Sequence, residues 1–372
     1  MTPRRTLLHV FPTFNVGGAQ MRFVQLANHF GCDYRHRIVA MDGGAAAFDR
    51  LKPGLDAALL EVPVRRQSMF GNLGTVRRVL KTLRPDLLVT SNWGSIDWAL
   101  ANLDGLVPHL HMEDGFGPEE TVTQLPRRVW TRRLALRRST VMLPSQTLFA
   151  LARDCWRLPR RRLTHVPNGI DCLRFDCGAD LAYAAAFGLE PGTPVIGTVA
   201  ALRAEKNLTR LIEAFAQLVR HRPARLVIIG DGPERTALAG RAAALGVEEQ
   251  VIFTGACATP EKLLALFTVF ALSSDTEQMP LSVLEAMAAG RPLVATAVGD
   301  VPVMVSDLNR PFVVGKDAGL LAGALLTLLD DPERARAVGD ANRLRAREVY
   351  DQRLMFDAYR QLYGPPAKIA GL

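Results

Sequence analysis

The chain has 372 residues, of which 48% are hydrophobic, so it is long enough and apolar enough to build two buried cores. No apolar run approaches the roughly 18 residues of a membrane span, and the apolar start, residues 6–11, is interrupted too soon by Pro12 for a secretion signal, which predicts a cytoplasmic globular protein. The net charge of +8 is compatible with an anionic partner, but it fits a general bias toward arginine equally well, because only six of the 45 basic residues are lysine.

In the first half of the chain, short apolar runs alternate with helical patterns. The series starts with a strand at residues 6–14, a helix at 19–30 and a strand at 36–42, and residues 76–91 hold a further helix and strand. This β-α-β rhythm predicts a parallel sheet covered by helices.

A second series of the same kind starts at residues 194–200 and continues to residues 292–298. Between the two series, the Pro-Asn-Gly sequence at residues 167–169 predicts a turn, where we place a domain boundary. The last helical pattern, in residues 331–363, has charged faces and is expected to break at Gly339 and near Tyr350.

We therefore expect an α/β protein with two Rossmann-like domains, residues 1–166 and 167–348. Residues 349–372 are expected to form a C-terminal helix that crosses back to the first domain. Open parallel sheets bind ligands at the carboxyl ends of their strands, so the active site is expected in a central cleft that the two domains face.

Two carboxylates, Glu277 and Glu285, stand on either side of a predicted helix start in the second domain. Pro280 suits the first turn of this helix. The free N–H groups of Leu281 and Ser282, at the positive end of the helix dipole, are suited to hold an anion. By spacing alone, however, such a carboxylate pair is more often a helix cap or a solvated charge than a binding site.

Two other loops of the second domain follow predicted strands. Arg203 and Lys206 come after the strand at residues 194–200, where a phosphate-binding site would lie, although a solvated loop charge is the simpler explanation of either residue alone. Gly230 and Asp231 belong to a glycine-containing turn after the next strand, which is a weak signal by itself.

In the first domain, Gly17 and Gly18 precede a helix and permit close approach of the backbone to a ligand. Their spacing lacks the full GxGxxG pattern, which argues against an NAD site. The cysteines show neither close pairing nor the spacing of a zinc site, so we expect inert thiols in a reducing compartment (Cys32, Cys155, Cys172, Cys177 and Cys257).

Each of these signals is weak, but together they resemble one family in order and spacing. The sequences "NVGGAQ", "VPNGID", "ALRAEKN", "IIGDGPER", "VIFTG" and "EQMPLSVLEAMAAGRPLVAT" are similar to those of the retaining glycosyltransferases of family 4, which have the GT-B fold. The resemblance covers nearly the whole chain, including the two glutamates with seven residues between them.

The resemblance implies a donor site in the second domain. Glu285 would hydrogen-bond the ribose of a nucleotide-diphosphate sugar, and Glu277 the hydroxyls of its sugar. Arg203 and Lys206 would neutralise the diphosphate. The remaining donor contacts would come from the helix start at Leu281 and Ser282, from the turn at Gly230 and Asp231, and from the first-domain loop at Gly18.

Members of the family commonly have a histidine of the N-terminal domain that faces the reacting sugar. His111, in "VPHLHMEDGFGPEE", matches that position best, and Glu113 and Asp114 are alternative candidates because Asp114 departs from the residue that relatives often show. A purely structural histidine is a further alternative. The sequence "EQMP" also departs from the commoner Glu-Gly-Phe-Pro, which leaves the identity of the sugar open.

The implied activity is transfer of a sugar from a nucleotide-diphosphate sugar to a lipid-linked or polysaccharide acceptor, with retention of anomeric configuration. Breaking the sugar–phosphate bond builds negative charge on the leaving phosphate, which fixed cations and helix N–H groups stabilise. Because the chain has no Asp-x-Asp sequence, Arg203 and Lys206 would take the place of a divalent metal ion, and no cofactor is expected. The alternatives are a nucleotide-sugar epimerase of the same fold, or a basic membrane- or nucleic-acid-binding protein without catalysis. The donor constellation argues against a pure binder, and we expect no nucleic-acid partner.

Residues 126–139, "PRRVWTRRLALRRS", hold six arginines around Trp130 in the domain expected to receive the acceptor (Arg127, Arg128, Arg132, Arg133, Arg137 and Arg138). On a helical wheel these arginines are scattered rather than gathered on one face. The segment is therefore either a solvated helix or a site of electrostatic docking on an anionic membrane. In the second case the enzyme would be peripheral at the inner face of the membrane.

Overall fold

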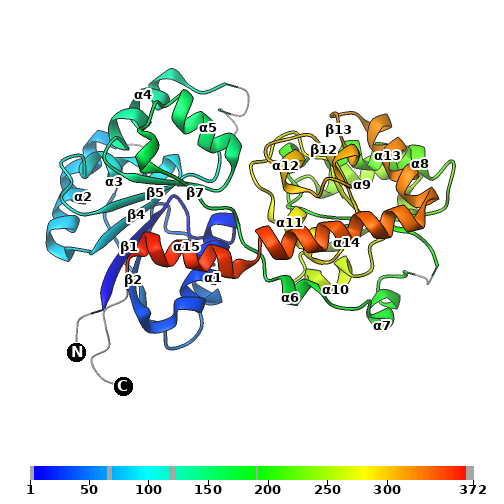
Figure 1. The fold of residues 1–372 in the computed structure, drawn as a ribbon, viewed down its shortest axis with the longest axis horizontal. Helices are drawn as coiled ribbons and strands as arrows, with labels where there is room; N and C mark the ends of the chain where they lie inside the picture. The colour runs from blue at the N-terminus through cyan, green and yellow to red at the C-terminus, as the bar shows by residue number, and fades with distance from the viewer. Residues whose placement is uncertain (1–3, 65–68, 117–119, 121–122, 190–191, 366–372) are drawn as a thin grey trace. The chain divides into compact units, whose positions relative to one another are not determined.

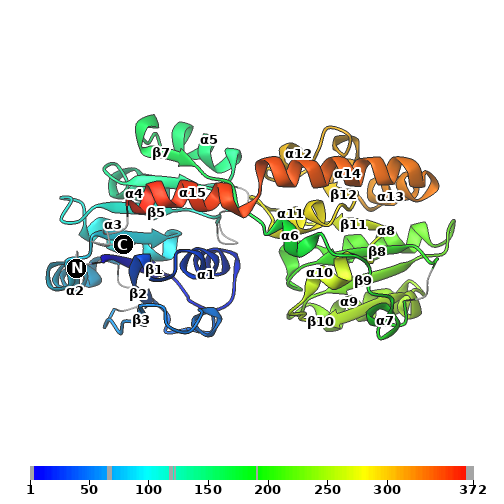
Figure 2. The same ribbon diagram turned by 60° about the horizontal axis from the view of Figure 1, so that its bottom comes forward.

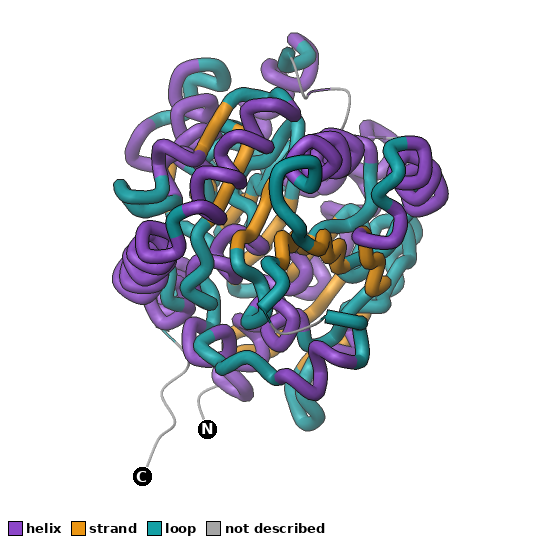
Figure 3. The backbone as a smooth tube through the Cα atoms, turned by 90° about the vertical axis from the view of Figure 1, so that its right-hand side faces the viewer, coloured by secondary structure: helices purple, strands orange, loops and turns teal. Residues whose placement is uncertain are grey.

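The computed structural model describes residues 4–64, 69–116, 120, 123–189 and 192–365. The chain divides into two compact units, residues 1–167 with 355–372, and residues 168–354. Each unit is a parallel β-sheet with helices outside it, which confirms the expected α/β fold of two Rossmann-like domains (Figures 1 and 3).

The first unit contains a seven-stranded sheet in the order β3-β2-β1-β4-β5-β6-β7. All neighbouring strands are parallel. The order reverses direction between β1 and β4, which is the topological switch point where open α/β sheets bind ligands. The strands are β1 (Arg5–Phe11), β2 (Tyr34–Ala40), β3 (Ala57–Leu59), β4 (Leu87–Ser91), β5 (His109–Met112), β6 (Thr140–Leu143) and β7 (Leu163–His165).

Alternate residues of these strands pack on opposite faces of the sheet, because successive side chains of a strand point to opposite sides. Leu7 and Val89 pack with helices α1 and α15, whereas Leu8 and Leu88 pack with α2 and α3. The helices are α1 (Gly18–Phe30), α2 (Met69–Leu83), α3 (Ile96–Ala101), α4 (Pro126–Ala135), α5 (Gln146–Asp154) and α15 (Gln352–Tyr363).

The second unit contains a six-stranded parallel sheet in the order β10-β9-β8-β11-β12-β13, with its switch point between β8 and β11. Helices α8, α9 and α13 share one core with the sheet, and α10 and α11 share the other. The strands are β8 (Val195–Val199), β9 (Arg225–Ile229), β10 (Val251–Gly255), β11 (Val269–Leu272), β12 (Leu293–Thr296) and β13 (Val313–Val314). The helices are α6 (Cys172–Phe175), α7 (Leu181–Ala185), α8 (Leu208–Leu218), α9 (Arg235–Ala244), α10 (Pro260–Leu264), α11 (Leu281–Ala288), α12 (Val301–Met304), α13 (Ala318–Asp330) and α14 (Pro332–Val349).

Helix α14 corrects one detail of the sequence-based prediction. The helix continues through Gly339, where a break was expected, and ends before Tyr350, as expected. Gly339 is buried because α14 packs against the end of α11 (Figures 1 and 2), and a side chain there would overlap the carbonyl oxygen of Gly290. The glycine therefore serves close helix packing rather than a turn. Among the described residues, no helix combines the length and apolar character needed to cross a membrane.

Candidate functional site

The switch point of the second unit brings together two of the predicted site residues. Lys206 ends the loop after β8, and Glu277 lies in the loop after β11. The ammonium of Lys206 donates a hydrogen bond of 2.7 Å to Oε1 of Glu277, and the hydroxyl of Ser274 donates another of 2.7 Å to the same oxygen. Both side chains are largely shielded from water, with 24% of Lys206 and 10% of Glu277 exposed.

A second set of polar contacts fixes the same two loops to each other. Asn207, in a left-handed conformation, caps α8 and donates 2.9 Å to Oδ2 of Asp275. Arg210, in the first turn of α8, donates 2.7 Å to the other oxygen of Asp275 and 2.8 Å to the carbonyl of Ser273. These contacts lie beside Lys206 and Glu277, so they hold the pair in place. Asp275 is more than 60 positions from Asn207 and Arg210, and nothing in the sequence pattern links residues so far apart, so these three contacts were not predicted.

Gly299 and Asn168 also support the loop that carries Glu277. Gly299 has φ of +50°, and a side chain there would lie 2.7 Å from the carbonyl oxygen of Gln278 and overlap that of Glu277. Asn168 donates 3.1 Å to the carbonyl oxygen of Met279. The predicted turn at residues 167–169 thus includes a residue that anchors the candidate site.

The other predicted residues of the β8 and β9 loops lie at the same edge of the sheet but are less constrained. Arg203 is exposed and forms no ion pair with a described carboxylate. Gly230 has φ of +136°, and a side chain there would overlap the carbonyl oxygen of Ala200. Asp231 is exposed, and its backbone carbonyl accepts 3.0 Å from the amide of Leu202. The two loops are therefore joined through their backbones, with Arg203 and Asp231 free to contact a ligand.

Helix α11 begins at Leu281, with Pro280 as the residue that caps it. The amides of Leu281 and Ser282 lie in its first turn, where N–H groups have no partner inside the helix. Glu285 lies one turn further, half-buried beside α6 and α10. Burial raises the pKa of Glu285 to about 7; Arg174 opposes the rise and Glu261 adds to it. The protein thus keeps a partly buried carboxyl group that forms no ion pair within the described residues.

The switch point of the first unit lies where the loops after β1 and β4 meet the end of β5. Gly18 begins α1 and is exposed, and a side chain added there would meet no atom within 4 Å. Asn92 follows β4 and accepts 2.7 Å from the amide of Asp114. The carboxylate of Asp114 is 18% exposed and accepts two hydrogen bonds from Arg22 of α1, the longer of them 2.8 Å. A partly exposed, oriented carboxylate therefore stands at this edge.

His111, the residue that best matched the family histidine, is fully buried at the end of β5. Its Nδ1 lies 2.7 Å from the hydroxyl of Thr90, and Nε2 lies 3.5 Å from the buried carboxylate of Glu113. The Thr90 hydroxyl also lies 2.8 Å from Nε2 of His109. A row of buried polar side chains therefore precedes Asp114, and we call it the internal polar chain. Its members are His109, Thr90, His111 and Glu113.

Arg132 of α4 completes this chain and changes the interpretation of the basic segment. Its guanidinium is fully buried, within 3.2 Å of both Glu113 and Glu120, and it stacks on aromatic rings of Trp93, Phe116 and Trp156. Arg132 therefore cannot contact a membrane, contrary to the view of residues 126–139 as a set of available arginines. The outward side of α4 carries Arg127, Trp130 and Leu134, which we call the α4 face; Trp130 is 66% exposed and Leu134 47%.

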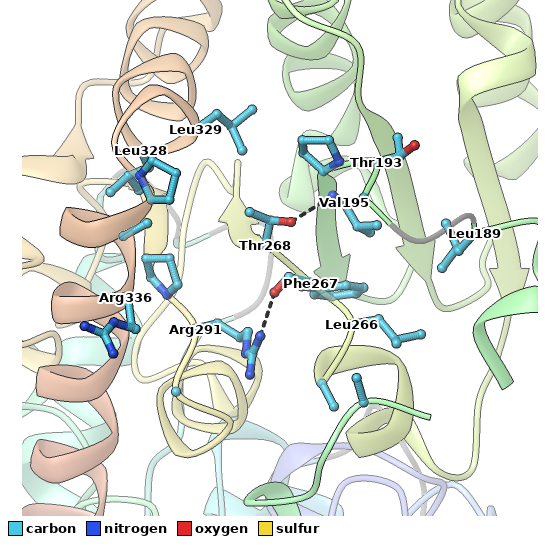
Figure 4. Close-up of a pocket in the computed structure, with 18 of the residues that line it drawn as sticks. Leu189, Thr193, Val195, Leu266, Phe267, Thr268, Arg291, Leu328, Leu329 and Arg336 are labelled. Carbon is cyan, nitrogen blue, oxygen red and sulfur yellow. Dashed lines mark hydrogen bonds between the residues drawn. The ribbon is translucent and has the colours of Figure 1, made fainter. Parts of the chain in front are cut away.

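A pocket of about 700 Å³ lies at the opposite edge of the second unit's sheet, next to the starts of β8, β11 and β12 (Figure 4). It is lined by Thr193, Thr268 and Arg291, among others, and by none of the predicted site residues. Arg291 donates 2.9 Å to the carbonyl of Phe267. Within the described residues no cluster of three or more histidine, cysteine or acidic side chains could hold a metal ion.

Two family models match successive parts of the chain. The model described as "Glycosyltransferase Family 4" matches residues 16–174, and the one described as "Glycosyl transferases group 1" matches residues 182–345. The first match extends a few residues into the second unit, which begins at Asn168, and the second match covers the loops with Lys206 and Glu277.

Curated relatives point the same way. The chain is 32% identical over 169 residues to N-acetyl-alpha-D-glucosaminyl L-malate synthase of Bacillus anthracis, a match that covers 45% of this chain and 43% of the relative. It is 31% identical over 204 residues to a GDP-mannose-dependent monoacylated alpha-(1-6)-phosphatidylinositol monomannoside mannosyltransferase of Corynebacterium glutamicum, with 51% of this chain and 53% of the relative covered. The matched part of the chain thus spans about half the length of these relatives.

Solved structures match over nearly the whole chain and share the fold. A glycosyltransferase from Rickettsia africae matches with a TM-score of 0.82 at 14% identity, covering 97% of this chain and 98% of that protein. HepE from Anabaena, in complex with UDP, matches with a TM-score of 0.80 at 19% identity, covering 96% and 99%. The two Rossmann-like units therefore form a GT-B fold.

Proposed function

Because the chain belongs to the group 1 and family 4 glycosyltransferases, we propose that it transfers a sugar from a nucleotide-diphosphate sugar to an acceptor. The proposed reaction retains the anomeric configuration and needs no divalent metal ion. The contact between Lys206 and Glu277 carries the proposal, because it places a cation and a carboxylate side by side at a switch point of the sheet. A neighbour of the same fold was solved with UDP-glucose, which supports a donor of this class.

In this mechanism the leaving diphosphate lies on fixed positive groups. Lys206 and Arg203 neutralise its charge, and the first amides of α11, at Leu281 and Ser282, donate hydrogen bonds to it. As the sugar–phosphate bond breaks, negative charge grows on the phosphate oxygen, so groups already aimed there favour the transition state. Arg203 is exposed and forms no ion pair with a described carboxylate, which supports this role.

Carboxylates fix the two ends of the donor. Glu277 accepts hydrogen bonds from hydroxyls of the sugar, and Glu285 from the ribose. The turn at Gly230 and Asp231 contacts the nucleotide through its backbone, and the close packing of Gly230 on the carbonyl of Ala200 holds this turn in position. A half-buried carboxylate such as Glu285, kept at an energetic cost, is more typical of a binding site than of a packing role.

The first unit contributes Gly18 and Asp114. Gly18 lets the backbone approach the phosphate and the reacting sugar, which agrees with the open space around it. We assign the sugar contact to Asp114, whose carboxylate is partly exposed, and a positioning role to His111, which is fully buried behind it.

The acceptor is a glycolipid or polysaccharide intermediate, and the enzyme works at the inner, cytoplasmic face of a membrane. Curated relatives include mannosyltransferases whose names specify phosphatidylinositol mannosides, which supports a lipid-linked acceptor. The α4 face combines an exposed Trp130 and Leu134 with Arg127, the residue types that favour an anionic membrane surface.

The proposal is tested by identifying the donor and its product. Nucleotide sugars are screened by thermal shift, because a donor that binds the folded state stabilises it. The product formed with a saccharide lipid acceptor is then followed by proton NMR, with and without excess EDTA. We expect retained configuration and undiminished activity in EDTA. Loss of activity that Mg²⁺ restores would contradict metal independence, and conversion of the donor without an acceptor would indicate an epimerase.

A further inference from the structure

The first unit has a pocket of about 630 Å³ at the amino ends of β4, β5 and β6, the sheet edge opposite Gly18 and Asp114. Three arginines from separate segments line it. Arg5 begins β1, Arg138 lies in the turn between α4 and β6, and Arg162 immediately precedes β7. The fold thus gathers three positive charges that are far apart in the sequence.

The described lining of this pocket includes no aspartate or glutamate. None of the three arginines forms an ion pair with a described carboxylate. The Nε of Arg5 is buried without a hydrogen-bond partner in the described structure, and Arg138 makes only a long bond of 3.4 Å to the carbonyl of Leu103. A buried donor without a partner, such as this Nε of Arg5, is unfavourable, which points to a missing acceptor.

Some other arginines of the chain, including two that line the pocket of the second unit, are paired with acidic side chains. In that pocket Arg222 pairs with Asp330 at 2.7 Å, and Arg343 lies 3.5 Å from Asp176. In the first unit, Arg77 pairs with Asp104 at 2.7 Å. The pocket at Arg5 differs because none of its three arginines has such a partner among the described carboxylates.

The floor of the pocket adds neutral polar groups. His109 and Ser139 line it, with Nδ1 of His109 2.7 Å from the Ser139 hydroxyl. Burial, together with His111, lowers the pKa of His109 to about 3, so this imidazole is uncharged at neutral pH. The positive charge at the pocket therefore comes from the arginines, with hydroxyl groups beside them.

We propose that this pocket binds a phosphate-bearing anion through Arg5, Arg138 and Arg162. Guanidinium groups match the oxygens of phosphate in pairs, and three of them around one cavity suit a phosphomonoester or phosphodiester. The volume admits a small organic phosphate. The phosphate belongs either to a soluble metabolite or to the headgroup of an anionic phospholipid. No residue is shared with the proposed sugar-transfer site, so the two proposals can fail separately.

The test compares two double variants of equal charge by calorimetry with glycerol 3-phosphate. Arg138→Gln with Arg162→Gln removes two lining arginines. Arg137→Gln with Arg161→Gln, the matched control, removes their exposed sequence neighbours outside the pocket. We expect the lining variant to bind about tenfold more weakly than the parent, and the control to bind within about twofold of it. Both variants keep the donor site, so any glycerol 3-phosphate that binds there contributes equally to the two measurements and does not affect their comparison.

Vesicles distinguish the source of the phosphate. The same two variants are sedimented with phosphatidylglycerol vesicles and with phosphatidylcholine vesicles. If the lining variant loses more sedimentation with phosphatidylglycerol vesicles than the control does, the ligand is a lipid headgroup. If the lining variant loses only the binding of glycerol 3-phosphate, the ligand is a soluble phosphate. Equal behaviour of the two variants in both assays would overturn the proposal. Circular dichroism verifies that each variant is folded, and Arg5→Gln provides an independent repeat.

Discussion

The ammonium of Lys206 and the carboxylate of Glu277 are hydrogen-bonded at 2.7 Å, although 71 positions separate them in the chain. In the proposed mechanism these groups serve different ends of the donor, the diphosphate and the sugar. Each is therefore the other's partner in the free protein, which keeps both oriented and avoids leaving a shielded charge unpaired.

The first prediction concerns this pair. Lys206→Ala and Glu277→Ala are each expected to lower kcat/KM by about 10²–10³, because each removes a group aimed at the transition state. The double variant should lose less than the product of the two, since each single change already breaks the shared contact. Steady-state kinetics of the wild type, the two single variants and the double variant give the coupling free energy between Lys206 and Glu277. Lys52→Ala, an exposed lysine of the first unit, is the control. Wild-type kcat/KM in Lys206→Ala would show that the pair is only structural.

Replacement by alanine is expected to affect activity at Gly18 and stability at Gly299. Gly18→Ala should leave the free energy of unfolding unchanged, because its side chain meets no atom, and yet lower kcat/KM by about tenfold or more by crowding the donor. Gly299→Ala should lower the free energy of unfolding by about 2 kcal/mol, because φ of +50° is unfavourable for alanine and the methyl group overlaps the Glu277 backbone.

Urea denaturation and kinetics measure both effects. Gly74→Ala, in helix α2 with open space around it, controls for the added methyl group. An active Gly18→Ala enzyme would remove Gly18 from the donor site, whereas an undisturbed Gly299→Ala protein would show that the loop can relax.

Glu285 predicts a pH-dependent stability. Its pKa of about 7 in the folded protein is higher than the ordinary value of 4.5, so the folded state binds more protons between these values and its stability falls as pH rises through them. Glu285→Gln should therefore raise the free energy of unfolding at pH 8 by about 1–3 kcal/mol, and have little effect at pH 4.5. The same substitution should weaken donor binding.

Urea midpoints at the two pH values measure the difference, with the exposed Glu248→Gln as control. A substitution at Glu285 that stabilises the fold while it impairs the donor site would show that the carboxylate is kept for binding. An equal midpoint shift at both pH values would argue against the raised pKa.

The α4 face predicts membrane binding that depends on apolar contact. Trp130→Ser with Leu134→Ser should weaken binding to phosphatidylglycerol vesicles about thirtyfold at low salt, because each exposed side chain contributes about 1 kcal/mol when buried. Leu344→Ser, on an exposed position of α14, should have no effect. If both proteins bind vesicles equally, α4 is a solvated helix.

The sequence was sufficient for the fold and for part of the site. Strand and helix periodicity predicted two parallel sheets. The rule that ligands bind at the carboxyl ends of strands drew attention to Lys206, and the helix start to Glu277, but neither observation predicted that the two side chains are in contact. Arg132 illustrates the limit. Its position in a basic segment suggested an exposed charge, whereas its buried partners, Glu113 and Glu120, lie 19 and 12 residues earlier and only the folded chain brings them together. Asn168 was recognised as a turn residue, but its bond to Met279 crosses 111 positions.

The polar chain behind Asp114 has a consequence for the placement of its hydrogen atoms. The Thr90 hydroxyl has one proton and lies between two imidazoles, so it donates to one ring and accepts from the other. Nε2 of His111 lies 3.5 Å from the Glu113 carboxylate and has no hydrogen-bond partner among the described residues, so the contact with Thr90 is the hydrogen bond that orients this ring. When Thr90 donates to Nδ1 of His111, it accepts from Nε2 of His109, and Nδ1 of the uncharged His109 ring then accepts from Ser139. A single hydroxyl thus couples the hydrogen positions of both histidines in the row that precedes Asp114.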